Sequence, residues 1–77
     1  METVTRSNDT YSVIINYDND LTSVDVFHIP TGISAIGHSR RMPEDIYDRE
    51  IGRNLAYFRA FERLSHKITK YYKRLTI

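Results

Sequence analysis

The chain has 77 residues, of which 40% are hydrophobic and 27% are charged, as expected for one small soluble domain. It contains no cysteine, which excludes disulfides and thiolate metal sites, so oligomerisation is the usual remaining support for so small a core. Its apolar runs fall short of the about 20 residues that a membrane span needs, and its N-terminus lacks an apolar signal segment, so we expect a cytoplasmic protein without membrane contact.

The net charge of +1 conceals a division along the chain. Nine acids and four bases precede Arg53, a sum of −5, whereas seven bases and one acid occur from Arg53 onward, a sum of +6. Such asymmetry is typical of a polyanion-binding surface. It is also what the helix macrodipole favours, because acids stabilise the start of a helix and bases its end. Both interpretations stay open.

Residues 1–9 are polar and show no periodicity, so we expect a loose lead-in. Residues 11–41 are expected to form a three-stranded antiparallel meander. The first strand is indicated by β-branched and aromatic residues alternating over 11–17, and the second spans about 22–29. A turn centred between Asn19 and Asp20 sets the register of this hairpin, because residues at equal distances before and after the turn lie opposite each other. The predicted inward pairs are Ile15 with Val24 and Val13 with Val26.

A second turn at Pro30 and Gly32 leads into the third strand, over about residues 33–41. Small residues at alternate positions would let a helix approach closely, which favours one face of this strand as the inner one. The side chains expected to face the helix are Ile33, Ala35, Gly37 and Ser39. Those expected on the open face are Ile36, His38 and Arg40, beside Ile14, Asp25 and Phe27. A slip of one residue would reverse the assignment.

Residues 42–47 are predicted to be a connector and residues 48–75 a long helix, with Asp45 or Asp48 as its N-cap. Such a helix spans roughly 40 Å, whereas strands of seven residues reach about 23 Å, so its last turns should project beyond the sheet. The projecting apolar residues are Ile68, Tyr71, Tyr72 and Leu75. They predict a homodimer in which a second copy covers them. The alternative is a helix that frays after Thr69.

Two further surfaces are candidate binding sites. The basic flank of the helix consists of Arg59, Arg63, Lys67, Lys70, Lys73 and Arg74. It could contact phosphates while Tyr71 or Tyr72 stacks on bases, or it could be an ordinary solvated face. The open sheet face offers Ile14, Phe27 and Ile36, a patch of the kind that often marks protein contacts. Alternatively, residues 1–9 cover this patch.

Catalytic and cofactor signatures are missing from the sequence. The three histidines lack metal-ligand spacing, the three glycines are isolated, and the acids before the helix are expected capping residues. We therefore expect no enzyme, no metal and no cofactor.

Three segments together resemble a known group of proteins. They are Thr-Gly through Ser-Arg at 31–40, Pro-Glu-Asp at 43–45, and the helical pattern Glu-Ile-Gly, Leu-Ala and Arg-Ala over 50–60. Across residues 11–68 the chain is similar to small uncharacterised proteins of actinobacteria and their phages. The resemblance implies a fold like that of double-stranded-RNA-binding domains, but no activity. The lysines with which those domains contact phosphates are absent, because the helix here opens with Asp48, Arg49 and Glu50.

These observations favour a small non-enzymatic interaction protein, encoded by a phage or prophage, that works as a dimer on a host or phage macromolecule. An inhibitor or modulator of a host protein is one such role. The alternative is a nucleic-acid-binding protein that uses the basic flank of its helix.

Overall fold

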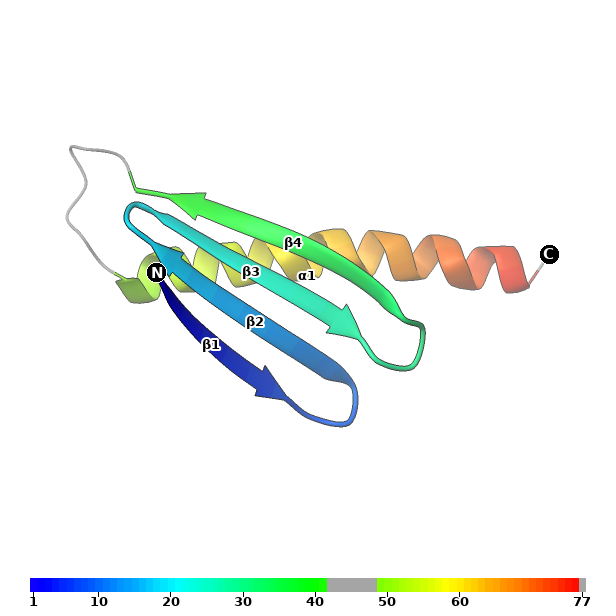
Figure 1. Ribbon diagram of the computed structural model, residues 1–77. Helices are drawn as coiled ribbons and strands as arrows, with labels where there is room; N and C mark the ends of the chain where they lie inside the picture. The colour runs from blue at the N-terminus through cyan, green and yellow to red at the C-terminus, as the bar shows by residue number, and fades with distance from the viewer. Residues whose placement is uncertain (42–48, 77) are drawn as a thin grey trace.

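The computed structural model describes residues 1–41 and 49–76 as an antiparallel sheet with one long helix against one of its faces (Figure 1). The elements in chain order are β1 (Glu2–Ser7), β2 (Tyr11–Asp18), β3 (Leu21–His28), β4 (Ile33–Arg40) and α1 (Arg49–Leu75). The strands lie in the order β1-β2-β3-β4. The predicted α+β class with one C-terminal helix is confirmed. The predicted connector at 42–47 and the N-cap at Asp45 or Asp48 lie outside the described residues.

The prediction of three strands is wrong, because residues 2–7 form β1 instead of a loose lead-in. β1 pairs with β2 along its whole length, from Glu2 opposite Tyr17 to Ser7 opposite Ser12. Apart from half-buried Val4, the side chains of β1 are exposed, so the strand carries little of the apolar alternation that marks the others. The turn is closed by Asn8, whose Oδ1 accepts hydrogen bonds from the N–H groups of Thr10 and Tyr11, both at 2.8 Å.

The register of the central hairpin agrees with the prediction. Val13 lies opposite Val26 and Ile15 opposite Val24, and all four side chains are buried under α1. The connection between β2 and β3 is two residues long, and Asn19 adopts a positive φ of 52°, which asparagine tolerates better than most residues.

The predicted faces of β4 are also confirmed. Ala35 and Ser39 are buried towards the helix, and Gly37 lies between them. A Cβ atom at Gly37 would collide with the backbone O of Ala56 and the backbone N of Ala60, so glycine is what admits the helix at this point. The core that results is small. Its buried hydrophobic residues are Val13, Ile15, Val24, Val26, Ala35, Ala56, Ala60 and Leu64.

The helix is longer than the sheet that it covers. α1 packs on β4 and β3, and its buried residues end at Leu64, although the helix continues to Leu75. The C-terminal turns project past the end of the sheet (Figure 1), and Leu75 is 63% exposed. The predicted overhang is therefore confirmed for Tyr71, Tyr72 and Leu75, whereas Ile68 is partly buried against the core instead of projecting. The alternative of a helix that frays after Thr69 is wrong, because the helix continues to Leu75.

Candidate interaction surfaces

The basic flank of α1 meets the outer edge of β4. Arg59 Nη1 donates a hydrogen bond to the carbonyl O of His38 at 2.7 Å, and Arg63 Nη1 donates to that of Ile36 at 2.6 Å. Lys67 Nζ donates to the carbonyl O of Ser34 at 2.8 Å. We call these three side chains the edge clamp, because they engage backbone acceptors that an edge strand directs away from its neighbour.

The spacing of the edge clamp follows from the repeats of the two elements. Four residues of helix advance about 6 Å, and two residues of strand advance about 6.8 Å. Since α1 runs antiparallel to β4, a residue four positions further along the helix lies opposite the outward carbonyl two residues earlier in the strand. The contacts number three because the next positions in this spacing, Leu55 and Tyr71, carry no basic side chain.

The edge clamp divides the predicted nucleic-acid-binding residues into two groups. Arg59, Arg63 and Lys67 bind β4. The other three members of the basic flank, Lys70, Lys73 and Arg74, lie on the projecting turns. Within the part of the chain that the structure describes, their side chains make no ion pair or hydrogen bond.

The open face of the sheet carries the predicted apolar patch. Ile14, Asp25 and Ile36 are direct neighbours across β2, β3 and β4, and Phe27 lies two residues from Asp25 on the same face. The three apolar side chains are 39–43% exposed. The alternative in which residues 1–9 cover the patch is wrong, because residues 2–7 extend the sheet as β1. At the margin of the patch, His38 Nδ1 lies 3.1 Å from Ser23 Oγ.

A second exposed apolar surface lies on α1, on the side away from the sheet. Ile51 is 65% exposed and Phe58 is 69% exposed, and Leu55 between them is also exposed. These residues were not among the predicted interface residues. The signal was present in the sequence as a spacing of four and then three residues, which is the repeat of a helix–helix contact. The predicted Tyr71 and Tyr72 are exposed on the overhang, and their rings meet edge to face with centroids 5.4 Å apart.

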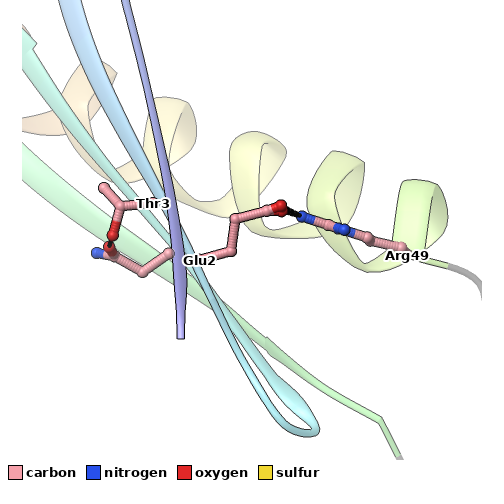
Figure 2. Close-up of polar contacts among 4 residues, drawn as sticks. Glu2, Thr3 and Arg49 are labelled. Carbon is pink, nitrogen blue, oxygen red and sulfur yellow. Dashed lines mark hydrogen bonds and ion pairs between the residues drawn. The ribbon is translucent and has the colours of Figure 1, made fainter.

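The start of α1 is tied to the first strand. Figure 2 shows the Glu2 carboxylate reaching from β1 to accept hydrogen bonds from Arg49 Nη2, which also makes an ion pair with it. This hydrogen bond lowers the pKa of the Glu2 carboxyl below its usual range and raises the pKa of Arg49. The guanidinium also lies over the ring of Tyr17, 3.7 Å from its centroid. Glu2, Tyr17 and Arg49 belong to β1, β2 and α1, so three elements meet at this contact.

Among the described residues, no buried side-chain nitrogen or oxygen lacks a hydrogen-bond partner. His28, which is buried, has its Nδ1 2.7 Å from Thr31 Oγ1, and its ring contacts Tyr11. Among residues 1–41 and 49–76, no three histidine, aspartate or glutamate side chains come together as metal ligands. No helix in that same part of the chain combines the length and hydrophobicity required to cross a membrane.

Comparison with known proteins adds no relative. No protein-family model, curated protein or solved structure matches the chain. The resemblance to actinobacterial and phage proteins, and to double-stranded-RNA-binding domains, stays a prediction.

Proposed function

We propose that the protein is a small non-enzymatic interaction protein that binds a partner protein through the open face of its sheet and works as a dimer. The observation that supports this proposal is the row Ile14, Asp25 and Ile36, with Phe27 beside it. These apolar side chains stay partly exposed, whereas the apolar side chains on the opposite face of the sheet are buried under α1. Exposed apolar clusters rimmed by polar groups are typical of protein contacts.

The chemistry of the patch indicates what a partner presents to it. A carboxylate lies between two isoleucines, so the complementary surface is apolar with one basic side chain at its centre. Such a charge pair beside apolar contacts contributes specificity as well as affinity. A phage- or prophage-encoded modulator of a host protein is the role that fits this proposal and the sequence resemblance together.

The experiment compares matched variants in binding. The chain is used to capture proteins from its native host, the captured protein is identified by mass spectrometry, and the purified pair is measured by calorimetry. Phe27→Ser and Ile36→Ser are expected to weaken binding by about tenfold or more each, because each removes buried apolar contact. The control is Ile29→Ser, since Ile29 is 45% exposed but lies beyond the end of β3. Equal affinity for all four proteins would contradict the proposal.

Nucleic-acid binding is the second candidate. It is supported by Lys70, Lys73 and Arg74 on the projecting turns, beside the exposed rings of Tyr71 and Tyr72. A gel shift on single- and double-stranded DNA and RNA at low salt tests it. Lys70→Glu with Lys73→Glu should abolish a shift without disturbing the edge clamp, and a shift that survives this change, or none with the unmodified chain, counts against it.

A further inference from the structure

α1 carries a second apolar stripe, which shares only Phe61 and Ile68 with the residues that pack against the core. Its positions follow the alternating spacing of three and four residues that defines a heptad seam, and six of the eight are apolar. We call them the heptad stripe: Ile51, Asn54, Phe58, Phe61, Ser65, Ile68, Tyr72 and Leu75. The buried Ala56, Ala60 and Leu64 lie on a different side of the same helix.

The heptad stripe is largely open to solvent. Its ends and middle are exposed at Ile51, Phe58, Tyr72 and Leu75, whereas Phe61 and Ile68 are partly covered by the core. A surface helix of a monomer has one apolar face, and that face is already used by the sheet. The second stripe extends for about 37 Å, so a partner that covers it would have to be about as long.

We propose that the partner is the heptad stripe of a second copy, packed antiparallel along the first. This inference rests on the dimer in the proposed function and specifies its contact. When the two helices lie antiparallel with Arg63 of one opposite Arg63 of the other, each a-type position of one copy faces a d-type position of the second. Antiparallel pairing requires this arrangement. The resulting layers are Ile51 with Leu75, Asn54 with Tyr72, Phe58 with Ile68, and Phe61 with Ser65, each occurring twice.

The charges of α1 favour the antiparallel direction. The first turn contains Arg49 and Glu50, whose charges cancel, whereas the last turn contains the bases Lys73 and Arg74. Antiparallel packing keeps the two basic C-terminal turns apart and aligns the helix dipoles favourably. Parallel packing would instead place two basic ends side by side.

A hollow in each chain lies beside the proposed contact. It has a volume of about 200 Å³, and Phe61 of the heptad stripe forms part of its wall together with Arg6, Tyr11 and Tyr57. The hollow exists because α1 packs on β3 and β4, which leaves the helix side of β1 and β2 less covered. A second helix beside α1 would cover it, so the dimer enlarges a core that is small in one chain.

The first experiment measures mass by light scattering after size exclusion, at tens of micromolar protein. The unmodified chain should be a dimer, and Phe58→Glu should raise the dissociation constant about a hundredfold or more, because it removes two large apolar contacts per dimer. Phe58 is exposed in the single chain, so the variant should fold, which far-ultraviolet circular dichroism checks. The control is Ile36→Glu, which should stay dimeric while losing capture of the partner protein. A monomeric unmodified chain, or a dimer indifferent to Phe58→Glu, overturns the inference.

The second experiment determines the direction of packing. The chain has no cysteine, so Asn54→Cys and Tyr72→Cys each carry a single thiol. A short bis-maleimide should cross-link the two variants when they are mixed, and neither variant alone. Cross-linking within each variant alone would show parallel packing, which overturns the register without affecting the open sheet face.

Discussion

Gly37 is the residue that determines how closely the helix approaches the sheet. A Cβ there would meet backbone atoms of Ala56 and Ala60, which cannot rotate away as a flexible side chain can. Gly52 offers a matched contrast, because its Cβ would lie at ordinary contact distance, 3.6 Å from Thr22 Oγ1 and 3.8 Å from Ser39 Oγ. The two glycines therefore differ in purpose although the sequence presents both as isolated glycines.

We expect Gly37→Ala to lower the free energy of unfolding by about 3 kcal/mol, at the upper end of the usual cost of overpacking, since α1 must move off β4. Gly52→Ala should raise it by up to about 1 kcal/mol, because alanine is the better helix former. Urea denaturation of both variants checks the pair. If both variants changed the free energy of unfolding in the same direction, the close approach at Gly37 would not be what limits how closely α1 packs on β4.

At the scale of the elements, α1 acts on β4 in two ways. Its buried alanines cover the inner face of the strand, and the edge clamp occupies the outward carbonyls of Ser34, Ile36 and His38. Exposed edge acceptors invite pairing with another chain, so the clamp protects this side of the sheet. β1 forms the opposite edge and carries charged Glu2 and Arg6, which discourage such pairing.

We expect Arg63→Met with Lys67→Met to lower the free energy of unfolding by about 1–3 kcal/mol, on the basis of roughly one hydrogen bond lost at each site. Amide exchange along β4 should also accelerate. The control pair, Lys70→Met with Lys73→Met, removes the same number of charges from the overhang and should leave stability within about 0.5 kcal/mol. Denaturation and exchange together test this, and equal losses from both pairs would mean that charge, not the edge contact, is responsible.

At the scale of the whole molecule, the ion pair between Glu2 and Arg49 joins the first strand to the start of the helix. Arg49 lowers the pKa of the Glu2 carboxyl, so this group contributes stability above its ordinary titration range. The contribution is lost as the pH falls through the lowered pKa, because the protonated carboxyl no longer attracts the guanidinium.

We expect Glu2→Gln to be less stable than the unmodified chain near neutral pH and equally stable well below the ordinary carboxyl range of about 4. Thermal melts across this pH range, with amide exchange of β1, provide the measurement. Glu62→Gln serves as the control, because Glu62 is exposed on α1 and makes no ion pair among the described residues. If Glu2→Gln lowered the melting temperature by the same amount in acid as at neutral pH, the ion pair with Arg49 would not be the cause.

The features that depend on local periodicity could be predicted from the amino-acid sequence. The pairing of Val13 with Val26, the inner face of β4 and the length of α1 follow from repeats of two and 3.6 residues, which any short window displays. The same alternation placed Ile14, Phe27 and Ile36 together on one face. The overhang followed from comparing the length of the helix with the length of the strands.

The features that depend on which elements become neighbours could not be predicted in this way and emerge from the folded chain. β1 forms because β2 offers it a free edge, and the side chains of such an exposed strand need not alternate. Arg59, Arg63 and Lys67 bind β4 because the close approach at Gly37 brings together two repeats of similar length. The exposure of Phe58 likewise depends on which side of α1 the sheet occupies. The sequence pattern records how often a residue type recurs along the chain, but not which residue of another element lies opposite it. Contacts between elements that are distant in the chain depend on those opposite residues.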